Sequence, residues 1–275
     1  MEKIVVKAKV DLVFRKFMSD NTDLLHDFLS SVLEIPYDSI KNIVIQNPEI
    51  FPDSIDNKFS RLDLKMLVDD KILNVEIQTR NQSFFIDRAM YYWSKLYSGE
   101  LKSGEGYVEL KQCITINIVD FNMFDCDDYY SEFIVTEKTR GEVLTEKFKI
   151  IFLELKKIGK KANKNNRREL WLQLINAESE EELQMLNQTG VPEIQKAVYV
   201  LNQMSKDEKI REAARMREKA LHDEVSALGE AKHEGMREGM EKGLEKGMEK
   251  GMEAMIEKMK RSGMSEEDIN KVLIN

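Results

Sequence analysis

The stretch from Arg61 to Gln78 constrains the fold more than any other part of the chain. Apolar residues occupy every second position on both sides of Asp69 and Asp70, with charged or polar residues between them. This period of two predicts two β-strands, each with one buried face and one polar face. The two aspartates predict a tight turn between the strands, so the chain must build a sheet around this hairpin.

A turn centred between Asp69 and Asp70 also predicts the register of the hairpin, and it sets Asp63 opposite Glu76. Opposed residues of an antiparallel pair share a face, with β-carbons roughly 4.5–5.5 Å apart. Two carboxylates held this close repel each other unless a cation lies between them. Mg²⁺ binds through one or two carboxylates and keeps positions open for water and a substrate phosphate. A solvated polar face on a half-buried hairpin is the alternative.

Asp63 and the triplet Glu76-Ile77-Gln78 resemble the D…(D/E)-x-K core of the PD-(D/E)XK nucleases, with glutamine in the position of the lysine. The flanking residues are similar to one branch, the Rpn family of recombination-promoting nucleases, also called PD-(D/E)XK family transposases. The shared motifs are Asp11-x-x-Phe14-Arg15-x-Phe17, Leu24-Leu25-x-x-Phe28-Leu29, Arg88-x-x-x-Tyr92-x-Ser94-Lys95-Leu96-Tyr97, Ile118-Val119-Asp120-Phe121, Leu153-Glu154-Leu155-Lys156-Lys157 and a glycine-methionine tail. Together they extend over nearly the whole chain.

The resemblance implies an α/β fold with a restriction-endonuclease-like mixed-sheet core (αβββαβ), followed by an all-helical C-terminal region. It also implies a DNA endonuclease that hydrolyses phosphodiester bonds with Mg²⁺ or Mn²⁺. Asp63, Glu76 and Gln78 are then the catalytic residues, and Asp63 and Glu76 are the metal ligands. Glutamine can bind the attacking water but cannot take its proton at neutral pH. More of the activation of the water therefore falls to the metal.

Asp11, Arg88 and Tyr92 are further candidates for the site. The first helix supplies an additional acidic ligand in some members of the superfamily, and Asp11 begins the first predicted helix; a helix cap explains the same residue. Arg88 and Tyr92 lie one turn apart on a helix predicted over residues 83–97. If this helix lies beside the hairpin, Arg88 can reach a phosphate or a catalytic carboxylate. An ion pair on the helix surface is the alternative.

Residues 156–168 hold seven basic side chains and no acidic one. Contacts to the nucleic-acid backbone need positive charge without base-specific hydrogen bonds. The predicted DNA-binding residues are therefore Lys160, Lys161, Lys164, Arg167 and Arg168. A solvated loop is the alternative interpretation of the same run.

Length and composition limit the remaining possibilities. With 275 residues, of which 42% are hydrophobic, the chain can form one large domain and an appendage. The net charge of −8 argues against a general nucleic-acid coat, yet residues 1–168 are near neutral, with 26 basic and 27 acidic side chains. Two cysteines, no apolar run long enough for a membrane and a charged start predict a reduced, cytoplasmic protein without a membrane segment.

The periodic elements suggest three regions. We expect a PD-(D/E)XK nuclease-like domain at residues 1–160, a helical region at 161–228, and a tail at 229–275 that ends in a helical hairpin. Within the nuclease region, the hydrophobic pattern predicts a helix over 22–33 and strands near 43–45, 113–121, 132–136 and 149–155.

In the tail, glycine recurs at every fourth position from Gly235 to Gly251, each followed by methionine or leucine. An interior glycine costs a helix roughly 1 kcal/mol relative to alanine. The tail therefore packs closely against another helix, or is only partly ordered, or is a tolerated repeat expansion. A second copy of the chain is the simplest partner, which predicts a homo-oligomer. The alternative function is a catalytically inactive DNA-binding or protein-interaction module that acts through this tail.

Overall fold

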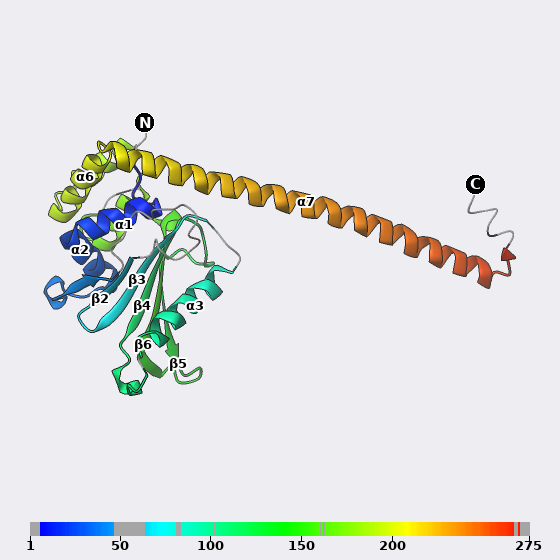
Figure 1. Ribbon diagram of the computed structural model, residues 1–275, viewed down its shortest axis with the longest axis horizontal. Coiled ribbons are helices and arrows are strands. Elements are labelled where there is room, and N and C mark those ends of the chain that lie inside the picture. The colour runs from blue at the N-terminus through cyan, green and yellow to red at the C-terminus, as the bar shows by residue number, and fades with distance from the viewer. Residues whose placement is uncertain are drawn as a thin grey trace. The chain divides into compact units, whose positions relative to one another are not determined.

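The computed structural model describes residues 6–46, 64–80, 84–101, 103–159, 161, 163–266 and 269. The chain divides into two compact units, Met1–Glu218 and Lys219–Asn275. The first unit contains a mixed β-sheet with helices on both faces, and the second contains most of the last helix (Figure 1).

In the described part of the chain the sheet has six strands, in the order β1-β2-β3-β4-β6-β5. The strands are β1 (Ile43–Ile45), β2 (Leu64–Val68), β3 (Lys71–Gln78), β4 (Cys113–Val119), β5 (Tyr130–Thr136) and β6 (Val143–Glu154). Strands β3, β4 and β6 run parallel at the centre, while β1, β2 and β5 are antiparallel to their neighbours. This mixed sheet confirms the predicted α/β fold class.

The helices of the first unit are α1 (Asp11–Asp20), α2 (Thr22–Leu33), α3 (Phe85–Ser98), α4 (Arg167–Asn176), α5 (Glu180–Asn187) and α6 (Pro192–Met204), with short 3₁₀ turns η1 (Tyr37–Ser39), η2 (Tyr107–Glu109) and η3 (Leu155–Lys157). Helix α7 (Glu208–Arg261) begins in this unit and continues into the second. Parallel strands need a crossover connection, and α3 provides it between β3 and β4.

The central hairpin has the predicted register as far as the structure describes it. Val68 pairs with Lys71, and Leu64 pairs with Val75. The turn places Asp69 at a φ of 52°, a left-handed conformation that aspartate tolerates better than most residues. Its carboxylate accepts hydrogen bonds from the backbone before β1, which fixes the turn to the neighbouring strand.

The two faces of the sheet are covered differently. On one face, Leu73, Val75 and Ile77 of β3 belong to the large apolar core that also contains residues of α1, α2 and α4–α6. The opposite face carries a smaller apolar cluster beneath α3. Because side chains alternate along a strand, Glu76 and Gln78 lie on the face that α3 covers.

Helices α4 to α6 complete the large core instead of forming a separate body. Asp27 of α2 is buried and accepts hydrogen bonds from Trp171 Nε1 at 2.7 Å and from Arg167 Nε at 3.1 Å. A buried carboxylate needs such partners because it has lost its hydration. The domain boundary predicted at residue 160 therefore falls inside the first compact unit.

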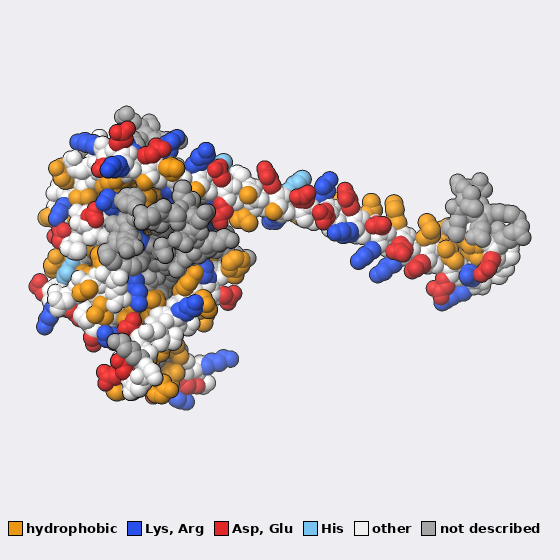
Figure 2. Space-filling view, in the orientation of Figure 1, with side chains coloured by type: hydrophobic (Ala, Val, Ile, Leu, Met, Phe, Trp, Pro, Cys, Tyr) orange, Lys and Arg blue, Asp and Glu red, His pale blue; other side chains and the backbone are white. Residues whose placement is uncertain are grey.

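Helix α7 is 54 residues long and includes all five glycines of the repeat. A β-carbon added at any of the five repeat glycines from Gly235 to Gly251 would meet no atom within 4 Å apart from the neighbouring backbone of α7 itself. The apolar residue that follows each glycine is at least 55% exposed, and Figure 2 shows these hydrophobic side chains between charged ones along α7. Within the described part of the chain, the repeat is thus helical with no other segment packed against its glycines. The second helix of the predicted terminal hairpin lies largely outside the described residues.

None of the described helices combines the length and the hydrophobicity that a bilayer crossing requires.

Candidate active site

The candidate site lies on β3, close to the carboxyl end of that strand. Glu76 is in register with Asn117 of β4, and Gln78 is in register with Val119. The backbone N–H of Asp120 donates to the carbonyl oxygen of Gln78 at 3.0 Å. The parallel strands β3 and β4 therefore end together, at one edge of the sheet.

Arg88 of α3 forms an ion pair with Glu76, its Nη2 donating to Oε1. Both side chains are largely buried, at 20% and 13% exposed. Burial raises the pKa of Glu76, and the guanidinium of Arg88 opposes that rise. The guanidinium carbon also lies 4.7 Å from the ring centroid of Phe85, which holds Arg88 against its helix. Arg88 thus contacts the predicted catalytic carboxylate.

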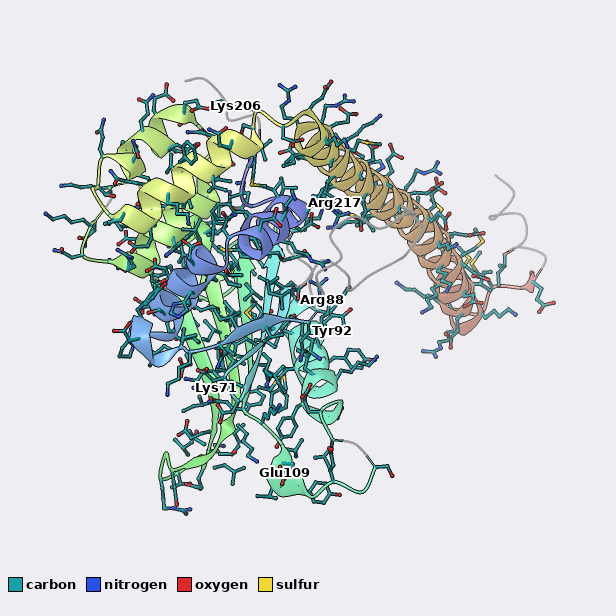
Figure 3. All side chains as sticks on the ribbon, turned by 60° about the vertical axis from the view of Figure 1, so that its left-hand side comes forward. Lys71, Arg88, Tyr92, Glu109, Lys206 and Arg217 are labelled. Carbon is teal, nitrogen blue, oxygen red and sulfur yellow. The ribbon has the colours of Figure 1, made fainter. Side chains whose placement is uncertain are left out.

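Tyr92 lies one helical turn after Arg88, and the two are neighbours on α3 in Figure 3. Its ring meets the ring of Tyr91 edge-on, with 5.8 Å between the centroids. The role of Tyr92 in the site remains a prediction.

Asp63, the second predicted metal ligand, lies outside the described residues. Leu64 pairs with Val75, and the same register continued by one residue would pair Asp63 with Glu76, as the sequence predicts. The opposition of the two carboxylates remains a prediction.

Asp11 is the first residue of α1, and its carboxylate binds Arg217 of α7. Arg217 Nε lies 2.9 Å from each carboxylate oxygen, and Nη2 also donates to Oδ2. The capping role expected for Asp11 is wrong, because Val10 holds the N-cap position. As a metal ligand, Asp11 would first have to exchange its guanidinium partner.

A charged cluster that sequence reasoning missed lies at the same edge of the sheet. Lys9 is buried, and its Nζ lies 2.9 Å from Asp120 Oδ2 and 2.5 Å from Glu178 Oε1. Lys156 Nζ lies 3.0 Å from the other oxygen of Asp120. Because Asp120 directly follows β4 and its N–H is bonded to Gln78, this cluster borders the candidate site. The sequence signal that could have revealed this cluster is Asp120, an acidic residue directly after the apolar run of β4.

Glu154 at the end of β6 is a second carboxylate of interest, because Val119 of β4 is in register with both Gln78 and Glu154. It is fully buried and accepts hydrogen bonds from the N–H of Met123 at 2.5 Å and from Lys157 Nζ at 2.7 Å. These bonds fix the loop after β4, so both oxygens of the Glu154 carboxylate already have hydrogen-bond partners.

The predicted DNA-binding residues are not equivalent in the structure. Arg167 forms ion pairs with the buried Asp27 and with Glu193, and Arg168 forms one with Glu34. Lys161 and Lys164 are exposed, and Lys160 lies outside the described residues. A contact between this run and DNA remains a prediction. The exposed Lys161 and Lys164 are better candidates for it than the two arginines, whose charges are paired.

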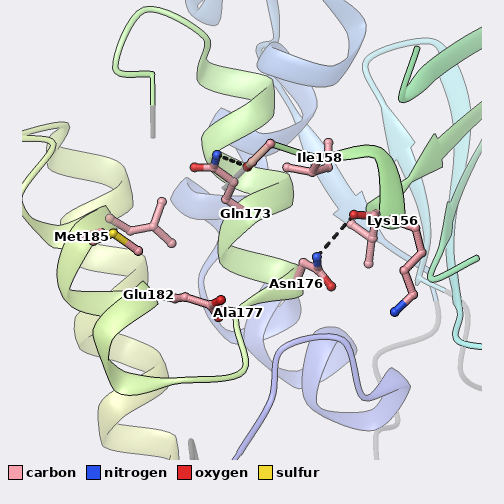
Figure 4. Close-up of a pocket in the computed structure, with 10 residues that line it drawn as sticks. Lys156, Ile158, Gln173, Asn176, Ala177, Glu182 and Met185 are labelled. Carbon is pink, nitrogen blue, oxygen red and sulfur yellow. Dashed lines mark hydrogen bonds between the residues drawn. The ribbon is translucent and has the colours of Figure 1, made fainter. Parts of the chain in front are cut away.

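A pocket of about 230 Å³ lies between η3 and helices α4 and α5 (Figure 4). Its polar side chains are used within the chain: Gln173 Nε2 donates to the carbonyl oxygen of Gly159 at 2.6 Å, and Asn176 Nδ2 donates to that of Leu155 at 3.3 Å. Neither Glu76 nor Gln78 lines this pocket, although Lys156, which pairs with Asp120, does.

The residues of the candidate site fit a hard divalent cation in their donor chemistry. Glu76 offers a carboxylate and Gln78 an amide oxygen on the same face of one strand, and Mg²⁺ prefers oxygen ligands. The described residues contain no group of three carboxylate, histidine or cysteine side chains that could hold a metal. A complete site therefore depends on Asp63 or on substrate oxygens.

Comparison with known proteins adds an independent finding. The model of a family described as PD-(D/E)XK nuclease family transposase matches residues 8–231. The matched region contains the sheet, α3 and the start of α7, and it ends before the glycine repeat. No curated protein and no solved structure is similar enough to count as a match.

Proposed function

Because the chain belongs to the PD-(D/E)XK nuclease family transposases, we propose that it is a divalent-metal-dependent DNA endonuclease that hydrolyses phosphodiester bonds. The observation that carries this proposal is the position of Glu76 and Gln78, on one face of a strand where two parallel strands end. In α/β sheets, ligands bind in the crevice outside such strand ends. The proposed place of action is the cytoplasm.

Each residue of the site has a distinct proposed role. Asp63 and Glu76 would hold Mg²⁺ or Mn²⁺, which when bound polarises the phosphate and makes a water molecule more acidic. The amide of Gln78 orients the attacking water by a hydrogen bond without accepting its proton. Arg88, already beside Glu76, offers a planar guanidinium that matches the geometry of a phosphate.

The replacement Glu76→Gln tests the proposal. We expect cleavage of plasmid DNA to fall to background, because the neutral amide is a much weaker ligand for the cation. The matched control is Glu132→Gln, which neutralises a carboxylate on β5 that pairs with Lys149 at 2.7 Å. The control should cleave like the unmodified protein. Cleavage that persists in Glu76→Gln, or in the unmodified protein with EDTA, would refute the assignment.

The second candidate function is an inactive DNA-binding or protein-interaction module. The observation that favours it is the row of exposed apolar side chains on α7, which suits a partner helix. The two candidates differ in the plasmid assay, because a module without catalysis shows no cation-dependent cleavage in any variant.

A further inference from the structure

One side of α3, together with its N-cap residue Phe84, carries aromatic and basic side chains in alternation. Phe84, Arg88, Tyr91 and Lys95 follow one another at spacings of four, three and four residues, which places them along one side of a helix. We call these four residues the α3 ridge. Phe84 is 59% exposed and Tyr91 is 54% exposed, although aromatic rings are normally buried.

The ring of Tyr91 is held by its neighbours and still open to solvent. Lys95 Nζ lies 4.9 Å from the centroid of the Tyr91 ring, and Tyr92 contacts the same ring edge-on at 5.8 Å. A ring with a fixed orientation loses little conformational freedom when a flat ligand stacks on it. The ridge thus offers a prepared aromatic surface with a cation beside it.

The α3 ridge is continuous with the candidate active site. Arg88 belongs to the ridge and also pairs with Glu76, so the ridge passes beside the predicted catalytic carboxylate. At a rise of 1.5 Å per residue, the Cα atoms of Phe84 and Tyr91 lie about 10 Å apart along the helix. A ligand that lies on the ridge therefore leads into the site.

Charge favours a polyanion as this ligand. The charged residues of α3 are Asp87, Arg88 and Lys95, and because Glu76 balances the charge of Arg88, Lys95 is the cation that lies exposed beside the ring of Tyr91. Single-stranded nucleic acid combines phosphates with exposed bases that stack on aromatic side chains, whereas the bases of a duplex are already stacked on each other.

We propose that the α3 ridge binds a single-stranded or locally unpaired segment of DNA, with bases stacked on Phe84 and Tyr91 and phosphates near Lys95. The inference rests on the proposed nuclease function and names its substrate class. The strand that is cleaved then reaches Glu76 in an unpaired state.

The test compares two double variants of the full-length protein. The ridge variant is Phe84→Ala with Tyr91→Ala. The matched control is Ile86→Ala with Met90→Ala, which removes two other exposed apolar side chains of α3, 47% and 52% exposed. Binding to a fluorescent single-stranded oligonucleotide and to a duplex of the same sequence is measured by anisotropy in EDTA, where cleavage is suppressed.

We expect the ridge variant to lose about fivefold or more in single-strand affinity for each ring removed, as stacking on aromatic side chains predicts. Its affinity for the duplex should change less, and the control should bind both ligands normally. Equal single-strand affinity in the ridge variant and the control overturns the proposal.

Leucine variants separate stacking from apolar contact. Phe84→Leu with Tyr91→Leu keeps apolar side chains at both positions but has no rings, so it should bind single strands as poorly as the alanine variant. Phe84→Tyr with Tyr91→Phe keeps both rings and should bind normally, which also shows that substitution at these positions preserves the fold. Normal binding by the leucine variant overturns base stacking and indicates an apolar docking surface for a protein.

The proposal and the nuclease assignment can fail separately. If Glu76→Gln abolishes cleavage while the ridge variant binds single strands normally, the ridge proposal fails and the nuclease assignment stands. If the protein never cleaves but the ridge variant loses single-strand binding, the nuclease assignment fails and the ridge proposal stands.

Discussion

Among the described residues, Arg88 is the charged partner of Glu76 that any cation must replace or share. Arg88 is bonded to its carboxylate, and both groups are largely buried, so their attraction is weakly screened by solvent. A divalent cation that binds Glu76 therefore competes with a guanidinium already in place. A guanidinium displaced from Glu76 would lie beside the negative charge that the substrate phosphate brings.

This competition predicts opposite effects of one substitution on binding and on catalysis. Arg88→Met should bind Mn²⁺ more tightly in the absence of DNA, because the competing cation is gone, and should cleave DNA more slowly. Titration calorimetry gives the first quantity and the plasmid assay the second. Lys149→Met, which removes the partner of Glu132, is the control. Equal Mn²⁺ affinities in Arg88→Met and the control contradict the prediction.

The two cysteines should differ sharply in reactivity. Burial raises the pKa of the Cys113 thiol to about 12, while Cys126 is exposed. Alkylation requires the thiolate, so Cys113 should stay unmodified in the native protein at mildly alkaline pH. Mass spectrometry after iodoacetamide treatment should find modification at Cys126 alone, and at both cysteines after denaturation. Rapid native labelling of Cys113 would mean that the β4 region opens readily.

Individual site residues were predictable where the argument was local. The strand period predicted that Glu76 and Gln78 share a face, and contact between Arg88 and a catalytic carboxylate was one of the two interpretations that the sequence left open for Arg88. The cluster around Lys9 was not predictable in this way. Its partners Asp120 and Glu178 are 111 and 169 residues away in sequence, and periodicity predicts which side chains are buried but not which distant ones meet.

At the level of elements, two aspartates of helix α2 allow a comparison between a buried and an exposed carboxylate. Asp27 is buried and bonded to Arg167 and Trp171, whereas Asp23 is half exposed and paired with Lys196. Asp27→Ala should lower the free energy of unfolding by about 3–5 kcal/mol, because it leaves the indole N–H of Trp171 without its acceptor and takes the buried partner from Arg167, which keeps only the partly exposed Glu193 among the described residues. Asp23→Ala should cost less than about 1 kcal/mol. Urea unfolding followed by circular dichroism measures both, and equal losses would contradict the structural role of Asp27.

Most elements were predicted close to their observed bounds, because each has an unmistakable period or turn. The helix at Thr22–Leu33, the hairpin, and the strand Cys113–Val119 agree with the sequence analysis. The boundary expected at residue 160 followed the change from alternating strands to helices, and local periodicity does not show which elements pack into one core. Arg167 and Arg168 belong to the basic run at residues 156–168, yet their charges are used to join helices of one core.

For the whole molecule, we propose that α7 mediates self-association. The five glycines from Gly235 to Gly251 have room for a methyl group, so alanine at all five should raise the helicity of α7. The same replacement should weaken a dimer only if glycine allows two backbones to approach closely. Sedimentation of the full chain, the alanine variant and a chain ending at Leu228 distinguishes these cases. Monomers of both the full chain and the shortened chain at micromolar concentration would exclude self-association.

The period of the α7 repeat has a geometric consequence of its own. One four-residue unit adds about 6 Å to a helix and turns everything beyond it by about 40°. Leu228 lies before the repeat and Met259 after it. The number of repeat units between them therefore determines both the distance between these two side chains and the angle between the directions in which they point. A twelve-nucleotide gain or loss in the gene would change both quantities together and keep the reading frame. Such a change would alter the spacing and the relative direction of these two side chains without altering a single residue of the first unit.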